Sequence, residues 1–325
     1  MKIGVFSMQR RQALQLFGAV LALATFGKAA AGRAAGGVKE IRIGYQKAGI
    51  STVIKQRQTL EAAFRPQGIG IQWVEFAFGP PILEGINTGN LDFGFTGDTP
   101  PIFAQAATPN LVYVATLPEH YAEGIVVQDA SPIKSLADLK GKKIGFGKAS
   151  SAHATLLYAL EKAGLAYSDI EPVYLAPADA LAAFTRGSID AWSIWDPYLS
   201  IAQTGKVRVI AYAADVRQAN TYFLANKDFA ANSAATLSKL LDAIAIDTRW
   251  AGEHHAEAAQ AIHDASGIDL QAIRTTIDRS NFVVRPTTDA DAAIQQGTAD
   301  RFLKIGLLPK PIKVSEIVWK WTPST

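Results

Sequence analysis

Two short stretches carry residue types that could bind an anion. Residues 89–101, GNLDFGFTGDTPP, and 187–197, GSIDAWSIWDP, share one pattern: Gly, Asp three residues later, and an apolar run. Each then has a second Asp (Asp98 and Asp196) with Pro close behind. The pattern predicts a strand that ends at a turn before a helix. Such a turn leaves backbone N–H groups unsatisfied at the helix start, where they can bind an anion.

Further turns of this kind are expected at residues 46–51, 79–81 and 147–152. Ligands of parallel α/β sheets bind at the carboxyl ends of the strands, which is where these turns lie. None of these turns, including the two at the ends of the repeated motifs, contains Arg. The hydroxyl side chains that they offer are those of Ser51, Thr99, Ser150 and Ser151. Neutral dipoles would therefore hold the anion. Taken singly, each polar residue could instead only cap its helix.

The two repeated acids need a different role, because a carboxylate should not face an anionic ligand. We expect Asp98 and Asp196 to cap or brace their turns. Trp195 ends the second apolar run inside a turn and could close over an apolar ligand body, or pack between lobes, whereas Trp192 is expected in the core. His153 could donate to the anion or be a satisfied surface residue.

Glu119 could meet a cationic part of a ligand or be a solvated loop residue. The turn at 147–152 is neither a G-x-S-x-G elbow nor a P-loop, and no G-x-G-x-x-G follows the first strand. The acids and histidines of residues 253–263 are expected on a solvated helix face, since adjacent histidines point apart on a helix. The sequence predicts no catalytic residue, metal site or cofactor.

The elements that position these turns alternate between strand and helix. The expected strands are residues 40–45, 71–76, 111–116, 124–128, 143–146, 171–175, 207–212 and 222–225, together with the two repeated motifs. The expected helices include residues 51–64, 100–107, 152–163, 177–185 and 197–204. Such alternation predicts an α/β fold with mostly parallel sheets flanked by helices.

The alternation forms two series, which predicts two lobes. Chain crossings are expected near residues 122–130 and 215–222, and two crossings would make a hinge. The first lobe is expected to comprise residues 38–125 and 220–325, and the second residues 126–219. The region from 233 to 302 is helical in pattern and is expected to pack on the first lobe.

Residues 1–37 are interpreted as a signal peptide. They carry five basic residues and no acid, so the remaining chain is net acidic although the whole has a net charge of +3. This excludes a general nucleic-acid electrostatic surface. The apolar stretch 14–24 is too short to span a membrane, and Arg10-Arg11 leaves both the Sec and the twin-arginine routes open. The chain has no Cys, so no disulfide or lipid anchor is expected, which favours a freely soluble periplasmic protein.

Four stretches resemble a known family: residues 41–47 (IRIGYQK), 76–107, 131–165 and 167–199. They are similar to the periplasmic aliphatic-sulfonate-binding proteins of ABC importers, the SsuA family. The resemblance implies a type II periplasmic-binding-protein fold, whose two α/β lobes close on a ligand. It also implies that the chain captures alkanesulfonates, as a monomer, for a membrane permease and its ATPase in sulfur acquisition.

Carried over by position, the family's sulfonate pocket falls on Gln46, Gly79, Pro80, Gly97, Asp98, Thr99, Ser150, Ser151 and His153, with Trp195 facing it from the second lobe. Glu119 is a further candidate ligand-binding residue, because it is expected near the rim of the cleft. At Asp98 the family also has glutamate, and residues 147–153 differ from its more usual Gly-Ser-Asn-His type of turn. An acid at position 98 is therefore compatible with the family, whereas the different turn at residues 147–153 affects the donors of the second lobe and the range of ligands.

Other functions remain open within the same fold. A receptor for taurine, nitrate or a thiamine-precursor pyrimidine would have the same architecture. Some pyrimidine-synthesising enzymes share it too, but the versions known use a cysteine-rich motif, and this chain has no Cys. The expectation is therefore a binding protein, not an enzyme.

Overall fold

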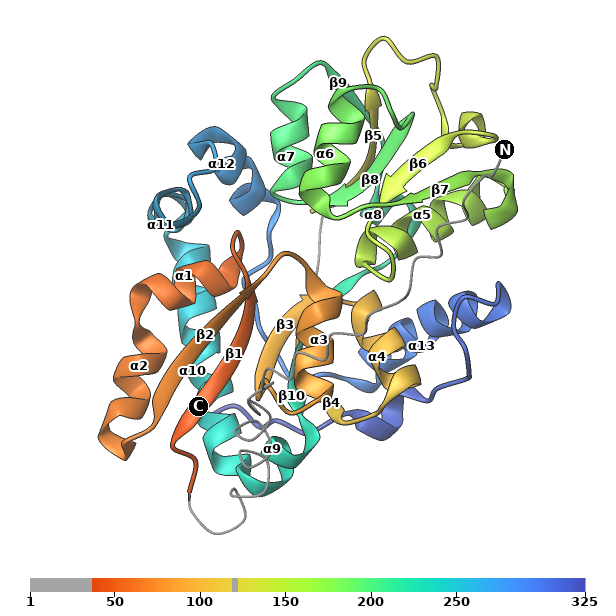
Figure 1. Ribbon diagram of the computed structural model, residues 1–325. Helices are drawn as coiled ribbons and strands as arrows, with labels where there is room; N and C mark the ends of the chain where they lie inside the picture. Colours follow the sequence, from red (N-terminus) through yellow and green to blue (C-terminus); the bar gives the residue numbers. More distant parts are fainter. Residues whose placement is uncertain (1–36, 119–121, 325) are drawn as a thin grey trace, which may run out of the picture. The chain divides into compact units, whose positions relative to one another are not determined.

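The computed structural model describes residues 37–118 and 122–324 (Figure 1). The predicted signal peptide and Glu119 lie outside these residues. Two five-stranded sheets form the framework. The first has the order β2-β1-β3-β10-β4 and comprises β1 (Glu40–Gln46), β2 (Gly70–Phe76), β3 (Phe93–Gly97), β4 (Leu111–Pro118) and β10 (Asn220–Asn226). The second has the order β7-β6-β8-β5-β9 and comprises β5 (Glu123–Gln128), β6 (Lys143–Phe146), β7 (Glu171–Tyr174), β8 (Ala191–Trp195) and β9 (Val207–Tyr212).

Each sheet is parallel except for one strand. In the first sheet β10 runs antiparallel to β3 and β4, and in the second β5 runs antiparallel to β8 and β9. Both exceptions are the first strand after the chain passes from the other sheet. The predicted α/β fold with mainly parallel sheets is confirmed.

The helices pack around these sheets. They are α1 (Ile50–Arg57), α2 (Thr59–Phe64), α3 (Gly79–Asn87), α4 (Thr99–Ala107), α5 (Ser151–Lys162), α6 (Pro177–Thr185), α7 (Tyr198–Gln203), α8 (Ala213–Val216), α9 (Lys227–Asn232), α10 (Ala234–Glu253), α11 (His255–Ser266), α12 (Leu270–Arg279) and α13 (Asp289–Lys304). Short 3-10 turns cover Arg65–Gln67, Leu136–Leu139, Tyr167–Asp169 and Val314–Ile317. Between residues 37 and 324, no described helix is both long and apolar enough to cross a membrane.

One predicted helix is divided in two. Residues 51–64 were expected to form a single helix, but α1 ends before Gln58, which has a φ of 53°. A left-handed residue cannot continue a right-handed helix, so α2 starts with a new axis.

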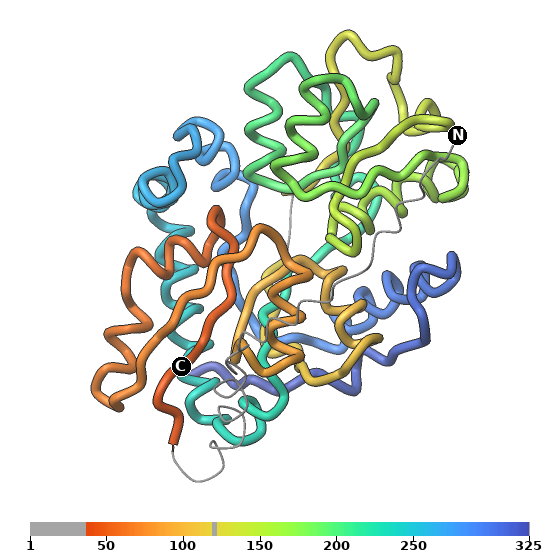
Figure 2. Tube along the Cα trace, viewed as in Figure 1, coloured from red at the N-terminus to blue at the C-terminus, as the bar shows by residue number. Residues whose placement is uncertain are grey.

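The C-terminal helices complete the core of the first sheet. Leu240 of α10 and Ile273 of α12 belong to one buried cluster with Ile41 of β1, and Figures 1 and 2 show α10 beside α1 and α2. These helices of the C-terminal region therefore pack against the first sheet. In addition, α12 contacts α7, a helix of the second sheet, so the tail touches both.

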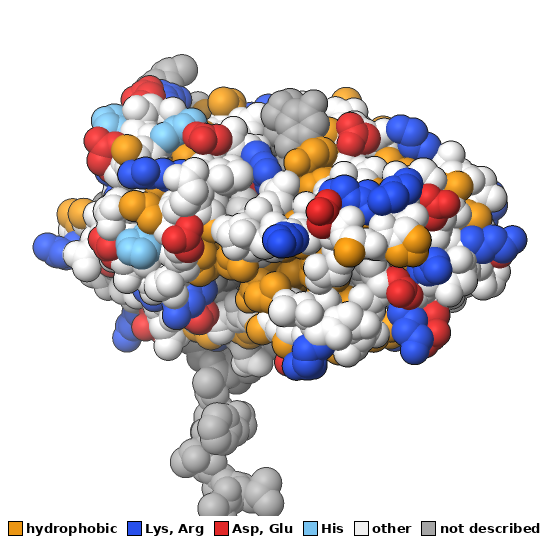
Figure 3. Space-filling view, turned by 90° about the horizontal axis from the view of Figure 1, so that it is seen from above, with side chains coloured by type: hydrophobic (Ala, Val, Ile, Leu, Met, Phe, Trp, Pro, Cys, Tyr) orange, Lys and Arg blue, Asp and Glu red, His pale blue; other side chains and the backbone are white. Residues whose placement is uncertain are grey.

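The second sheet has a core on each face. Phe146 packs with Leu156 of α5 on one face, and Trp192 packs with Phe184 of α6 on the other. Trp192 is fully buried, which confirms its predicted core position. On the face shown in Figure 3, acidic and basic side chains are interspersed without an extended area of one sign.

Candidate functional site

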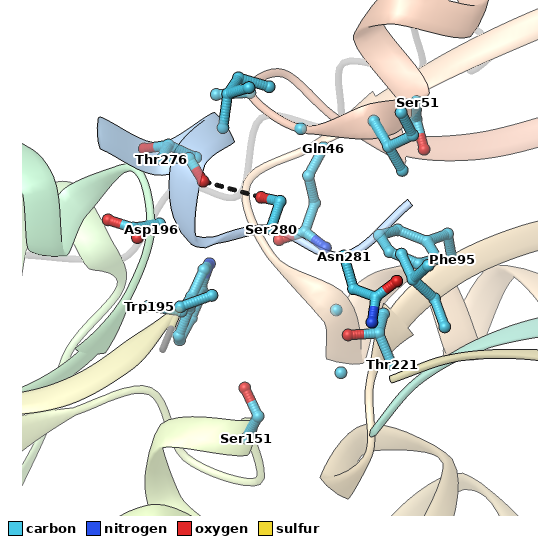
Figure 4. Close-up of a pocket in the computed structure, with 18 of the residues that line it drawn as sticks. Gln46, Ser51, Phe95, Ser151, Trp195, Asp196, Thr221, Thr276, Ser280 and Asn281 are labelled. Atoms are coloured by element: carbon cyan, nitrogen blue, oxygen red, sulfur yellow. Dashed lines mark hydrogen bonds between the residues drawn. The ribbon is translucent and has the colours of Figure 1, made fainter. Parts of the chain in front are cut away.

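A cavity of about 150 Å³ lies among turns that follow strands of both sheets (Figure 4). The first sheet and its connections contribute Gln46, Gly79, Phe95, Gly97, Leu117 and Thr221. The second contributes Ser150, Ser151, Trp195 and Asp196. Residues of the C-terminal helical region complete the wall, namely Ile262, Thr276, Ile277, Ser280, Asn281 and Phe282.

Four helices begin at this cavity with uncapped N-termini. Gly49 precedes α1, Gly79 begins α3, Gly97 lies two residues before α4, and Ser151 begins α5. None of the four helices has an N-cap side chain that accepts a hydrogen bond from its first turn. Among the other described helices α9, α12 and α13 are capped by Asn226, Asp269 and Thr288, whereas the remaining ones also lack such a cap. The first N–H groups of α1 and α5 are left for a ligand or water, and so is that of Gly79 in α3. The prolines at the second and third positions of α3 and α4 have no N–H to offer.

The cap at α1 differs from the prediction. Ser51 was expected to cap its helix, but α1 begins at Ile50 and Gly49, two residues before Ser51, occupies the N-cap position. Ser150 does stand at the N-cap of α5, yet its hydroxyl donates to the carbonyl of Gly147 at 2.7 Å instead of accepting from the helix. Both serines line the cavity.

Gly97 and Ser151 bring the two sheets together at the cavity. A Cβ atom added at Gly97 would lie 2.8 Å from the Cβ of Ser151, closer than real Cβ atoms approach one another. Only a residue without a side chain allows these two turns to meet so closely. The turn of residues 89–101 thus lies against the start of α5, a helix of the second sheet.

Asp98 and Thr99 are turned away from the cavity. Asp98 is 2% exposed, and its carboxylate accepts from the guanidinium of Arg217, with which it forms an ion pair. The hydroxyl of Thr99 donates to the same carboxylate at 2.9 Å. Neither residue lines the cavity, so the predicted contact of the Thr99 hydroxyl with the anion does not fit this structure. Asp98 braces the turn, which fits the role expected for the acid itself.

Arg217 is the centre of a buried charge network. Its Nη2 lies 3.1 Å from Oε2 of Glu123, and its Nε donates to the hydroxyl of Thr155 at 3.0 Å. It also donates to the carbonyl oxygen of Ser151 at 3.3 Å. Ser151, whose carbonyl oxygen belongs to the network, also lines the cavity. Glu123 and Arg217 come from the two chain crossings, and Ser151 and Thr155 come from α5. Sequence patterns gave no sign of this network.

Asp196 braces the start of α7, as predicted for the second repeated acid. Its Oδ1 accepts from the N–H of Ser200 at 2.8 Å and from the hydroxyl of Ser200 at 2.6 Å. Burial raises the pKa of Asp196, and the nearby Arg279 guanidinium, 3.4 Å from Oδ2, acts in the opposite direction. Arg279 ends α12 and also donates to Gln203 of α7 at 2.6 Å, so it joins α12 to the second lobe.

His153 lies in an aromatic environment behind the cavity. It is 1% exposed and packs between Phe146 and Phe302. Its Nδ1 accepts from the N–H of Ala149 at 3.3 Å, which places the ring proton on Nε2, 3.0 Å from the hydroxyl of Tyr167. Burial lowers the pKa of His153 to about 3, so the ring is neutral at neutral pH. His153 and Pro80 do not line the cavity, so the structure does not bring them to the predicted site.

The cavity wall contains few charges. Among the lining residues that the structure describes there is no Lys, Arg or His, and the single acid, Asp196, is paired with Arg279. The side chain of Gln46 points into the cavity and has no hydrogen-bond partner among residues 37–118 and 122–324 (Figure 4). An anion placed here would therefore be held by neutral donors.

The C-terminal segment 276–282 was missed by the sequence reasoning. It comprises the last turn of the amphipathic helix α12 and the residues directly after it, and the polar pair Ser280-Asn281 at the helix end was the available signal. The segment reaches the cavity because Arg285, just beyond it, pairs with Thr116 of β4 through two backbone hydrogen bonds of 2.8 and 3.0 Å. No local pattern predicts that pairing.

Comparisons with known proteins agree with this architecture. Residues 64–258 match the family model described as NMT1/THI5 like. An aliphatic sulfonates-binding protein of Escherichia coli (strain K12) is 42% identical over 286 residues, which cover 87% of this chain and 89% of the relative.

Two solved structures share the fold along nearly the whole chain. One is the alkanesulfonate-binding protein SsuA from Xanthomonas axonopodis pv. citri bound to MOPS, with a TM-score of 0.82 and 38% identity over 86% of this chain and 98% of that one. The other is the periplasmic aliphatic sulphonate binding protein SsuA from Escherichia coli, with a TM-score of 0.80 and 40% identity over 88% and 94% of the two chains. With the two-lobed α/β fold and the cavity between its sheets, these similarities show that the chain belongs to the NMT1/THI5-like family and, within it, to the SsuA family of aliphatic-sulfonate-binding proteins.

Proposed function

We propose that this protein is a periplasmic receptor that captures aliphatic sulfonates and delivers them to an ABC permease and its ATPase for sulfur acquisition. The observation that carries the proposal is the cavity itself, in which four uncapped helix N-termini meet an apolar wall without a cationic side chain among the described lining residues. The identity of 42% to an aliphatic sulfonates-binding protein supports the choice of ligand.

The polar part of the cavity suits a sulfonate head. A sulfonate has three acceptor oxygens, no donor, and a charge that persists at neutral pH. Backbone N–H groups at Gly79, Gly97 and Ser151 and the carboxamide of Gln46 are the donors we propose for it. Each helix N-terminus adds about 0.3–1 kcal/mol of charge interaction to the hydrogen bonds.

The apolar part of the cavity suits the ligand's carbon chain. Trp195 from β8 and Phe282, which follows α12, both line it, together with Ile262. A volume of about 150 Å³ favours small organic anions over peptides or sugars of several units. The combination of a dipolar end and an aromatic wall is the reason to prefer an organosulfonate to inorganic sulfate or nitrate.

Capture by closure is part of the proposal. Residues 38–125 with 220–325 and residues 126–219 would form lobes that close over the ligand, with the hinge at the two crossings. The close approach of Gly97 to Ser151 and the bond between Arg279 and Gln203 are contacts that a closed state would use. Export by the Sec or the twin-arginine route, followed by removal of residues 1–37, would place a monomeric receptor, and not an enzyme, in the periplasm.

Isothermal calorimetry with a ligand panel tests the proposal. The panel contains ethanesulfonate, butanesulfonate, octanesulfonate, taurine, sulfate, nitrate and an aminopyrimidine precursor of thiamine. We expect alkanesulfonates to bind most tightly, with sulfate and nitrate at least tenfold weaker because they lack the chain that contacts Trp195. Firm binding of another solute without sulfonate binding would overturn the proposal. Recovery of the sulfonate unchanged, without sulfite, separates a receptor from a desulfonating enzyme.

A further inference from the structure

Asn281 is a cavity residue to which neither the sequence motifs nor the family resemblance assigned a role. It follows α12 by two residues and lines the cavity. Figure 4 shows its side-chain nitrogen directed into the cavity, toward the region that Gln46 and Thr221 border. Thr221 pairs with Gly97 in the first sheet, so Asn281 approaches the sheet edge where the uncapped helices begin.

The orientation of the Asn281 carboxamide is fixed by a backbone bond. The N–H of Val283 donates to Oδ1 of Asn281 at 2.9 Å. The oxygen must occupy that position because only an acceptor can take a bond from a backbone N–H. The NH₂ group therefore lies on the opposite side of the planar amide. Nδ2 has no hydrogen-bond partner in the parts of the chain that the structure describes.

The segment that carries Asn281 is held at both ends. On one side the hydroxyl of Ser280 donates to the carbonyl of Thr276 in α12 at 2.8 Å. On the other side Arg285 is bonded to Thr116 of β4 through both backbone groups. A donor held in this way loses little conformational freedom when a ligand binds, so more of its hydrogen-bond energy contributes to affinity.

Two neutral amide groups thus offer N–H donors to a cavity whose described wall holds no cation. Gln46 projects from the end of β1 and Asn281 from the segment after α12. Their complement is a head group that presents acceptors alone. If the head group carried its own N–H or O–H next to these two amides, that donor would face the amide NH₂ groups and neither would find an acceptor, which is unfavourable.

We infer that Nδ2 of Asn281 binds the anionic head group together with Gln46, and that this pair selects heads that only accept hydrogen bonds. The inference rests on the proposed function and deepens it. It assigns the selection of sulfonate over an isosteric sulfonamide to a residue of the C-terminal segment. Asn281 would also couple that segment to the ligand, because the same amide bonds to the ligand on one side and to Val283 on the other.

The test substitutes Asn281→Asp and titrates butanesulfonate by calorimetry. Aspartate has the same shape and still accepts from Val283, but its second oxygen places a negative charge where the NH₂ stood. We expect the affinity to fall by about a hundredfold or more, since the introduced carboxylate would directly face the negative head group. Asn232→Asp adds the same charge at an exposed position of α9 and is expected to leave the affinity within about twofold.

The pH dependence separates a ligand contact from a structural role. Lowering the pH from about 8 to about 5 protonates part of the carboxyl group introduced by Asn281→Asp and is expected to restore part of the affinity of that variant alone. Asn281→Ser is a second variant, because serine can keep the turn to Val283 while it removes the NH₂ donor. We expect about a tenfold loss for it. Butanesulfonamide should bind neither the wild type nor the variants.

The outcomes are distinct. If the wild type binds butanesulfonate and the folded Asn281→Asp and Asn281→Ser variants bind it equally well, the inference is overturned while the proposed function stands. If the wild type binds no sulfonate of the panel, the proposed function fails and the inference fails with it. Loss of affinity in both variants, with thermal unfolding midpoints close to that of the wild type, supports the inference.

Discussion

The guanidinium of Arg217 and the carboxylate of Asp98 form a buried ion pair between segments 119 residues apart in the chain. Asp98 lies between β3 and α4 of the first sheet, and Arg217 lies between α8 and β10, where the chain returns from the second sheet. Both side chains are almost fully buried. The pair therefore joins the turn next to the cavity to the chain crossing.

Replacing Arg217 with Met is expected to destabilise the protein strongly. It leaves the carboxylates of Asp98 and Glu123 buried without their cation, and breaking a buried pair in this way costs about 3–5 kcal/mol. Lys143→Met is the control, since Lys143 and its partner Glu171 are both largely exposed and the change should cost about 1 kcal/mol or less. Urea unfolding measures both. Similar losses in the two variants would show that the buried network does not hold the fold.

Gly97→Ala is expected to weaken ligand binding more than it weakens the fold. The added methyl group would collide with Ser151, so the two turns must separate and the closed cavity opens. We expect a loss of affinity of about tenfold or more, since overpacking typically costs about 1–3 kcal/mol. Gly49→Ala is the control, because it also lines the cavity but its Cβ would meet nothing within 4 Å. Calorimetric titration with butanesulfonate measures the affinity of both variants. Equal affinities would contradict the inferred close approach of Gly97 to Ser151.

Trp195→Ala is expected to reduce sulfonate affinity more than His254→Ala does. The indole lines the cavity, and removing it takes away apolar contact worth about 1.5–3 kcal/mol, or roughly ten- to a hundredfold in affinity. The ring of His254 instead stacks on Trp250 at 4.7 Å, and neither residue lines the cavity. Calorimetric titration with butanesulfonate compares the two. Equal affinities of the two variants for butanesulfonate would show that Trp195 does not contact the bound ligand.

His153 is expected to make the protein sensitive to mild acid. Its pKa is lowered from 6.5 to about 3 in the folded state, so the unfolded chain binds the proton first as the pH falls. Stability from this residue is present above pH 6.5 and is lost at about 1.4 kcal/mol per pH unit between 6.5 and about 3.

The substitution His153→Gln should remove this component. Between about pH 7 and pH 5, the free energy of unfolding of the variant should fall by about 2 kcal/mol less than that of the wild type. Urea unfolding at the two pH values measures the difference, with His254→Gln as the control. If the wild type and His153→Gln lose the same free energy of unfolding, the buried neutral ring does not account for the acid sensitivity.

The sequence alone determined the elements and the turns that depend on local signals. The alternation of strands and helices follows from side-chain periodicity, and the turns at Gly79, Gly97 and Ser151 follow from Gly, Pro and Ser at strand ends. These turns line the cavity because the strands before them are parallel and end at one sheet edge. Gln46 and Trp195 were placed by the family resemblance, and the structure brings both to the cavity.

Tertiary structure alone decided which side chains turn toward the ligand and which turn away. Asp98 faces Arg217, which is distant in the chain, and Thr99 turns with it because its hydroxyl donates to the Asp98 carboxylate. His153 is enclosed from one side by Phe302, which also comes from a distant part of the chain. Asn281 enters the cavity only because Arg285 pairs with β4. Contacts of this kind depend on packing between segments more than a hundred residues apart, and a local sequence pattern contains no information about that packing.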